Sequence, residues 1–324
     1  MKLEEMRYFV EIVKSGSINQ ASKILYVAQP ALSRTIASLE RELGFPLLER
    51  SKHGVVPTTE GKTVYDDCLK ILSLYDNCER HWETLAYHKQ ENAEPVTIQI
   101  VALPMICNNT MNQVMVEMAK NYPRIRLKLF ERQLQSVLET AVSTPHSIAI
   151  SHYNKRTKST VYAFAKDHDM QVLPLFDDEY RLFASKDNPL LQKPSILKKD
   201  LKNYTIASYS DDNLIQNPCF INAGLTDHLE IIDNVLYLSN RYDMMQLAAK
   251  NSQILTISAF YMTQTDPFRE SNQLVALPAN LYAIPMTYYI LFPERPTLEE
   301  HLTVRTLQTH FNALAGISLN SNIL

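Results

Sequence analysis

The chain has 324 residues, 45% of them hydrophobic, which allows two or three domains with ordinary globular cores. Its formal net charge is −3, but residues 1–58 hold eight Lys or Arg against six Asp or Glu, so the start of the chain is weakly basic and the rest is acidic. No apolar run approaches the roughly 18 residues of a membrane span, the N-terminus does not resemble a signal peptide, and no cysteine spacing is typical of zinc, so we expect a reduced, cytoplasmic protein.

The first part of the chain predicts a pair of short helices. Residues 3–14 have apolar side chains at helical spacing, and Gly16 ends this helix. In the next helix Ser17 can cap the backbone N–H of Gln20, and Gln20 can reach back in a capping box. The inward face of this second helix is formed by Ile18, Ala21 and Leu25.

A third helix is predicted after a turn at residues 26–28. It has Pro30 in its first turn, where a missing N–H costs nothing, and Gly44 stops it. Its apolar stripe consists of Leu32, Ile36, Leu39 and Leu43. The opposite face carries side chains suited to base edges and phosphates, namely Gln29, Ser33, Arg34, Thr35 and Ser38. The pattern alone also fits an ordinary solvated helix pair.

A basic hairpin and a long helix follow. Residues 45–58 alternate enough for a two-stranded wing, whose tip at residues 50–54 suits a DNA backbone or minor groove, although a solvated hairpin tip has the same pattern. Residues 59–88 predict one helix, roughly 45 Å long at 1.5 Å per residue. Its apolar residues recur at spacings of four and three, which is typical of two paired helices; packing inside its own domain is the alternative. The seam is Val64, Cys68, Ile71, Tyr75, Cys78, Trp82 and Leu85.

Several segments here resemble the helix-turn-helix of LysR-type transcriptional regulators: Ala21, 29–34, Leu39-Glu40, Leu43-Gly44 and 47–50. The resemblance implies a winged helix-turn-helix that binds double-stranded DNA, with the third helix in the major groove. The DNA contacts that it implies are Ser17, Ile18, Asn19, Gln29, Pro30, Ala31, Ser33, Arg34, Thr35, Arg50, Ser51, Lys52, His53 and Thr58. Ala28 departs from the family, which usually has serine there, and the lost cap costs about 1 kcal/mol. The resemblance also makes the long helix the element through which subunits pair into a homodimer or homotetramer.

Residues 96–316 alternate strands and helices, so we expect an α/β fold with a parallel sheet and right-handed crossovers. The first part predicts strands at 96–102, 125–130 and 147–151 and helices at 107–121 and 134–142. The second part predicts strands at 170–175, 179–185, 204–208, 229–233 and 254–257, helices at 212–223 and 242–251, a stretch at 282–292 that crosses back, and a final helix at 297–314.

This order resembles the periplasmic-binding-protein-like effector domain of the same family, in which two α/β lobes are joined by crossing strands. The domains we expect are a DNA-binding domain (1–58), a linker helix (59–88), a hinge (89–95) and an effector domain (96–316). Lobe I spans about 96–162 and 281–316, and lobe II about 163–280.

The effector of this family lies between the lobes, where strands end at their carboxyl side. The matching residues are Leu103, Pro104, Met105, Asn108, Glu131, Arg132, Tyr209, Ser210, Ser258 and Tyr261. Arg132 stands where relatives often have glycine and could pair an anionic ligand, and an ordinary surface arginine is the equal alternative.

The sequence therefore predicts a cytoplasmic, nucleoid-associated DNA-binding regulator of the LysR type that is modulated by a small-molecule effector and needs no cofactor or metal. One alternative is a regulator whose body binds a partner protein. Another is a solute-binding protein, which would leave residues 1–88 unexplained. We do not expect an enzyme, because the phosphate-loop, dinucleotide, serine-hydrolase and zinc-protease motifs are missing from the sequence.

Overall fold

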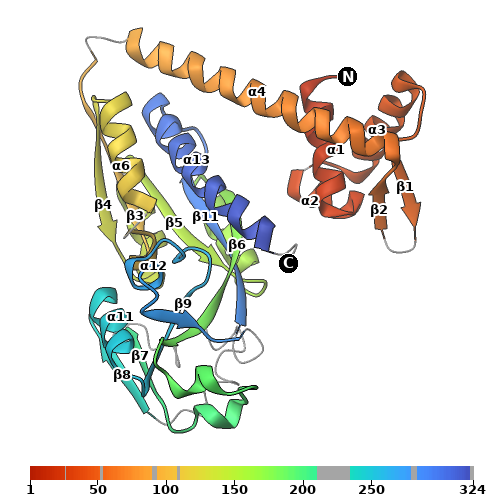
Figure 1. Cartoon of the computed structure of the whole chain (residues 1–324). Helices are drawn as coiled ribbons and strands as arrows, with labels where there is room; N and C mark the ends of the chain where they lie inside the picture. Colours follow the sequence, from red (N-terminus) through yellow and green to blue (C-terminus); the bar gives the residue numbers. More distant parts are fainter. Residues whose placement is uncertain are drawn as a thin grey trace. The chain divides into compact units, whose positions relative to one another are not determined.

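The computed structural model describes residues 1–25, 27–51, 54–89, 93–107, 110–209, 234–278 and 283–321. The chain divides into two compact units, Met1–Lys89 and Gln90–Leu324, which are considered separately (Figure 1). Within the described residues, no helix has both the length and the apolar character needed to cross a membrane.

The first unit is a three-helix core with a hairpin and a long helix. Its elements are α1 (Leu3–Ser15), α2 (Ile18–Leu25), α3 (Gln29–Leu43), β1 (Leu48–Ser51), β2 (Gly54–Pro57) and α4 (Thr59–Lys89). The predicted stripe of α3 is confirmed, because Leu32, Ile36 and Leu39 are buried in one apolar cluster. Phe9 and Ile12 of α1 join this cluster.

Short polar contacts fix the ends of these helices. The Ser17 hydroxyl accepts the predicted hydrogen bond from the Gln20 N–H at 3.3 Å. Ala28 precedes α3 and provides no side-chain cap, as its identity predicted. Gly16 ends α1 with a φ of +62°, and its carbonyl accepts a hydrogen bond from the N–H of Val55 at 2.8 Å. This last bond ties the second strand of the wing to the turn between α1 and α2.

The wing is fixed to the helices at its base as well. β1 and β2 pair antiparallel, from Leu48 opposite Pro57 to Ser51 opposite Gly54. One carboxylate oxygen of Glu40 accepts the N–H groups of Leu47 and Leu48 at 2.8 and 3.3 Å. The hairpin is therefore held by α3 at one end and by the α1–α2 turn at the other.

The second unit is built on one mixed sheet. Its strands are β3 (Val96–Ala102), β4 (Ile125–Glu131), β5 (Ser147–Tyr153), β6 (Met170–Ser185), β7 (Thr205–Tyr209), β8 (Asn234–Leu238), β9 (Ile254–Ala259), β10 (Leu274–Ala276) and β11 (Ala283–Pro293). The order is β4-β3-β5-β11-β6-β9-β7-β8, with β10 also on β6. The parallel pairs are β3 with β4, β3 with β5, β7 with β8 and β7 with β9, as the α/β prediction requires.

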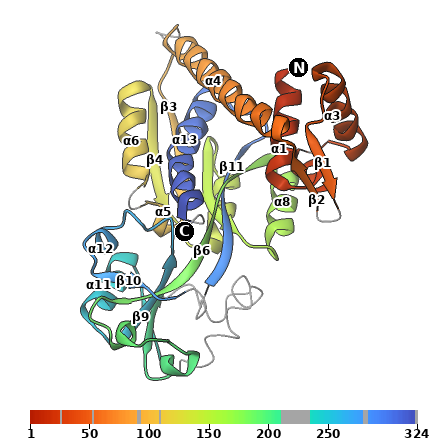
Figure 2. The ribbon, with the colours of Figure 1, turned by 45° about the vertical axis from the view of Figure 1, so that its right-hand side comes forward.

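Helices cover both halves of this sheet. They are α5 (Pro104–Cys107), α6 (Thr110–Asn121), α7 (Leu134–Ser143), α8 (Lys158–Asp167), α11 (Arg241–Lys250), α12 (Pro267–Glu270) and α13 (Leu298–Ser321), with short 3-10 turns η1 (Pro189–Gln192) and η2 (Lys198–Leu201). α13 lies along α6 (Figure 2). Met111, Val114 and Met118 of α6 are fully buried.

Two long antiparallel strands, β6 and β11, join the two halves of the sheet (Figure 1). The prediction of two strands at 170–175 and 179–185 was wrong, because residues 170–185 form one continuous strand. α5, α8, β8 and β10 were not predicted from the sequence. The helix predicted at 212–223 and the strand at 229–233 lie outside the described residues.

Candidate functional site

The exposed face of α3 is the polar face that the sequence predicts for DNA. Gln29, Pro30 and Arg34 are exposed, and Ser33 and Thr35 are half-buried. The Nε of Arg34 donates to the carbonyl of Pro30 at 3.3 Å, which leaves the outer part of the guanidinium beyond the helix surface. The amino-terminal part of a recognition helix is the part that reaches base edges.

Two of the predicted DNA contacts are corrected by the structure. Ile18 is buried in the apolar cluster, because the face of α2 that carries it packs against α1. Thr58 is buried, and its hydroxyl donates to the carbonyl of Pro46 and accepts from the N–H of Gly61, both at 2.8 Å. Both side chains hold the domain together and have no face left for DNA.

The other predicted contacts divide by position. Asn19 is exposed and Ser17 and Ala31 are half-buried. Lys52 and His53 lie outside the described residues, and for Arg50 and Ser51 the structure describes only the main chain. The wing strands that carry these residues are nevertheless fixed beside α3 by Glu40.

The predicted seam of α4 divides into a buried and an exposed part. Val64 and Cys68 pack into the apolar core of their own unit, and the Cys68 thiol lies 3.8 Å from the sulfur of Met1. For these two residues, packing within the same subunit was therefore the correct alternative. Further along, large apolar side chains are exposed: Ile71 (44%), Leu74 (66%), Trp82 (57%) and Leu85 (50%). Leu74 was absent from the predicted seam.

The carboxyl ends of strands from both halves of the second unit meet along β6. Tyr153, the last residue of β5, pairs with Thr287 of β11, and Thr287 pairs with Asp177 of β6. Ala259, the last residue of β9, pairs with Tyr180 of β6. Strands of the two lobes thus end against the same few residues of β6. We call this region the inter-lobe site.

Some predicted effector residues are part of the protein core instead. Leu103 and Pro104 are buried beneath the β3–α5 turn. Ser258 is buried in β9. Tyr261 is half-buried, and its backbone N–H donates to Asp178 at 2.8 Å. Asn108 and Ser210 lie outside the described residues, and only the main chain of Tyr209 is described.

Met105 contacts both crossing strands near the inter-lobe site. Its sulfur accepts contacts from the hydroxyl of Tyr288 at 3.0 Å and that of Tyr180 at 3.9 Å. The Tyr180 hydroxyl shares a hydrogen bond of 2.9 Å with Nε2 of His152. Burial of the ring lowers the pKa of His152 to about 4, so this imidazole is neutral at physiological pH.

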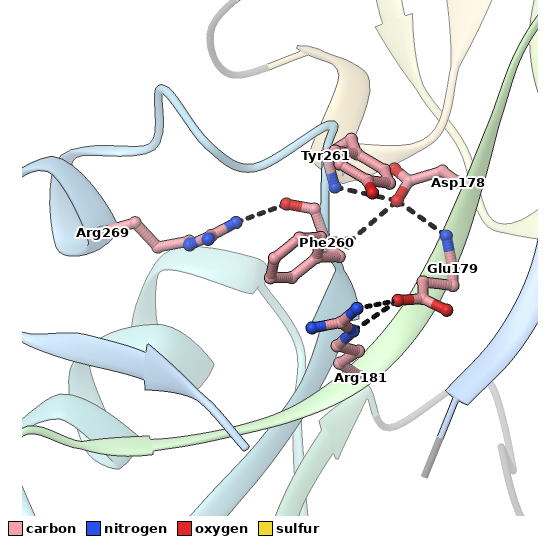
Figure 3. A network of polar contacts seen from close by, with 6 residues as sticks. All are labelled: Asp178, Glu179, Arg181, Phe260, Tyr261 and Arg269. Atoms are coloured by element: carbon pink, nitrogen blue, oxygen red, sulfur yellow. Dashed lines mark hydrogen bonds and ion pairs between the residues drawn. The ribbon is translucent and has the colours of Figure 1, made fainter. Parts of the chain in front are cut away.

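Asp178 ties the crossing strand to the turn that follows β9 (Figure 3). Its carboxylate accepts the N–H groups of Glu179, Phe260, Tyr261 and Met262 at 2.7–3.1 Å. Burial raises the pKa of Asp178 to about 6, although the four N–H groups act to lower it.

Two arginines hold the same turn from either side. The guanidinium of Arg181 lies 3.8 Å from the ring centre of Phe260 and pairs with Glu179. The guanidinium of Arg269 lies 4.9 Å from the same ring and donates to the Phe260 carbonyl (Figure 3). Both cations are therefore engaged in fixing the turn.

The two other arginines near the lobe boundary differ sharply. Arg132 is exposed, and its Nη1 donates to the neighbouring carbonyl of Glu131 at 2.9 Å. Arg241, the first residue of α11, is only 5% exposed and pairs with Asp266 at 2.6 Å. Arg241 was not among the predicted site residues. Within the described part of the chain, no cluster of His, Cys, Asp or Glu could hold a metal ion.

Two family models match the chain. The bacterial regulatory helix-turn-helix protein, lysR family, matches residues 3–62, and the LysR substrate binding domain matches residues 92–310. Together they account for most of the sequence.

Relatives agree with this family. The nitrogen assimilation regulatory protein nac of Escherichia coli is 36% identical over 132 residues, which is 40% of this chain and 42% of nac. The HTH-type transcriptional regulator BenM of Acinetobacter baylyi is 28% identical over 207 residues, 58% of this chain and 66% of BenM. Each match thus spans less than two thirds of the relative.

A solved structure extends the likeness of the fold to nearly the whole chain. CrgA, a LysR-type transcriptional regulator from Neisseria meningitidis, is 20% identical, with a TM-score of 0.60 over 97% of this chain and 99% of CrgA. The winged helix-turn-helix and the two-lobed sheet both belong to the pattern that the family models describe. This chain therefore belongs to the LysR family of transcriptional regulators.

Proposed function

We propose that this protein binds double-stranded DNA of a specific sequence through α3 and the wing, and regulates transcription in response to a small molecule bound between its two lobes. The observation that carries the DNA part is the exposed polar start of α3 on a helix whose other face is fully buried. Gln29, Ser33 and Arg34 supply donors and acceptors at successive turns of that helix.

The wing supports the same proposal. It extends from the α3 side of the unit, is fixed by Glu40, and carries basic residues at its tip. A basic hairpin tip is attracted to the phosphate backbone and to the negative potential of the minor groove.

The exposed part of α4 supports assembly of at least two subunits. Leu74 and Trp82 expose a large apolar area on a helix, which water disfavours and a second copy of the same helix would cover. We therefore place the pairing surface at residues 71–85 rather than along the whole predicted seam. A dimer or tetramer would present two α3 helices to a DNA site with two-fold symmetry.

The second unit supports an effector role. Its match to the LysR substrate binding domain and the convergence of strand ends at Asp177–Tyr180 support a ligand site between the lobes. The comparisons do not favour the alternative of a regulator that binds only a partner protein. We place the protein in the cytoplasm at the nucleoid.

The DNA proposal is tested with a matched pair of arginines on one helix. Arg34 and Arg41 lie on the same face of α3, and each donates its Nε to the carbonyl four residues earlier. Arg41 lies two turns nearer the end of the helix, farther from the base-reading part. Arg34→Ala should weaken binding to a DNA duplex enriched from a random library by about 1–3 kcal/mol, and Arg41→Ala by clearly less.

Fluorescence anisotropy measures both variants on the enriched duplex and on a scrambled one. If Arg34 reads a base, the loss is confined to the enriched duplex. Equal, unimpaired binding by wild type and Arg34→Ala would mean that α3 is not the recognition helix.

A further inference from the structure

Arg241 is held rigidly at the start of α11. The side chain of the preceding Asn240 caps the helix by accepting the N–H of Asp243 at 2.8 Å. The guanidinium Nη1 pairs with one oxygen of Asp266, whose other oxygen accepts the N–H of Phe268 at 3.0 Å. Because Asp266 is itself fixed, the orientation of the Arg241 guanidinium is set before any ligand arrives.

The opposite edge of this guanidinium has no acceptor among the described residues. Nε and Nη2 of Arg241 are both buried, and neither has a hydrogen-bond partner within the residues that the structure describes. These two nitrogens lie on one edge of the guanidinium plane, where their N–H bonds run parallel and match the two oxygens of a carboxylate. A buried charged group with two unmet donors is costly, so an acceptor at this edge would stabilise the site.

The start of α11 lies beside the inter-lobe site, because α11 packs against the crossing strand β6. α11 begins where β8 ends, at the same sheet edge as the last residues of β7 and β9. Burial raises the pKa of Glu131, the last residue of β4 in lobe I, and the positive charge of Arg241 lowers it. Burial also raises the pKa of Tyr288 in β11, and the positive charge of Arg241 again lowers it.

We propose that the ligand of this regulator carries a carboxylate, which Arg241 binds through Nε and Nη2 while Asp266 holds Nη1. The inference rests on the proposed effector function and names the chemical class of the effector. Since both nitrogens are buried, a ligand reaches them only when the residues that cover them move, so its binding selects between two arrangements of those residues. Arg132 is not the anchor, because it is exposed and already donates to its neighbour.

The test is thermal unfolding of the full-length protein with small probes at matched ionic strength. Sodium formate, the smallest carboxylate, should raise the melting temperature above that in sodium chloride. Acetate and glycine should do so as well, and acetamide should not. No response to any of the three carboxylates, or an equal response to acetamide, overturns the proposal.

Two variants assign the effect to Arg241. Arg241→Lys keeps the pairing with Asp266 and the fold but offers no two-donor edge, so the apparent Kd for the carboxylates should rise by about tenfold or more. Arg132→Gln, which removes a neighbouring exposed cation, should leave the Kd unchanged. An unchanged Kd in Arg241→Lys, or loss of binding in Arg132→Gln, rejects Arg241 as the anchor.

DNA binding is measured separately on the enriched duplex. If the protein binds that duplex but no carboxylate, the present inference fails and the DNA proposal stands. If carboxylates bind through Arg241 but no duplex is enriched, the proposed function fails and the anion site stands.

Discussion

At the scale of single residues, two groups near the inter-lobe site have pKa values that are shifted in opposite directions by burial. His152 resists taking up a proton, since burial lowers its pKa to about 4, and Asp178 keeps one, since burial raises its pKa to about 6. In the unfolded chain the ordinary values are near 6.5 for histidine and 3.9 for aspartate. Between pH 4 and 6 the two groups therefore change the free energy of unfolding in opposite directions.

Replacing His152 should reveal its contribution to the pH dependence of the free energy of unfolding. As the pH falls from 6.5 to 4, the unfolded chain binds a proton at this histidine that the folded protein refuses, so stability is lost. His152→Gln should abolish that loss, which amounts to about 2 kcal/mol between pH 7.5 and pH 5. Urea unfolding at several pH values measures it, because subtracting the two curves cancels every other group. Parallel curves for wild type and variant would contradict a buried, neutral His152.

Arg241 shows why residue-level roles were the hardest to predict. In the sequence it opens a helix beside Asn240 and Asp243, where an exposed, solvated arginine is the ordinary expectation. Its burial depends on Asp266, which belongs to another element. Local patterns carry no information about such a contact.

At the scale of elements, the wing is positioned by backbone that only glycine permits. Gly54 has a φ of +126°, and a Cβ built on it would lie 2.5 Å from the carbonyl oxygen of Gly16. Gly44, at the end of α3, also has a positive φ (+82°), but a Cβ there meets nothing within 4 Å. A substitution at Gly44 therefore measures backbone strain alone, and one at Gly54 measures strain together with a steric clash.

Gly54→Ala should destabilise the first unit by about 1–3 kcal/mol more than Gly44→Ala does. It should also weaken DNA binding, because relief of the clash moves the wing away from the α1–α2 turn. Chemical unfolding of both variants and anisotropy on the enriched duplex provide the two measurements. Similar values for both would show that the wing tolerates the displacement.

The elements themselves were largely predictable where their pattern is local. The spacing of Leu32, Ile36 and Leu39 and the glycines that end α1 and α3 predicted the first helices correctly. β6 was predicted as two strands because Asp177 and Asp178 interrupt its apolar pattern. The structure keeps it whole because four backbone N–H groups satisfy Asp178.

At the scale of the whole molecule, the heptad pattern of α4 serves two different surfaces. Val64 and Cys68 bury into the core of the first unit, and residues 71–85 leave apolar side chains exposed. Spacing alone could not separate these parts, since both continue one helical stripe. On our account the exposed part pairs two subunits, and a paired protein reads a repeated DNA sequence.

Selection of DNA from a random duplex library by the full-length protein tests this account most directly. We expect the enriched sequences to contain an inverted repeat, with half-sites separated by about one helical turn or a multiple of it. Leu74→Glu should break the dimer seen by light scattering and weaken binding to the repeat, and Ser73→Glu, at the exposed neighbouring position, should do neither. A library that shows no enrichment would contradict the DNA-binding claim, and enrichment of single half-sites bound by a monomer would contradict the assembly.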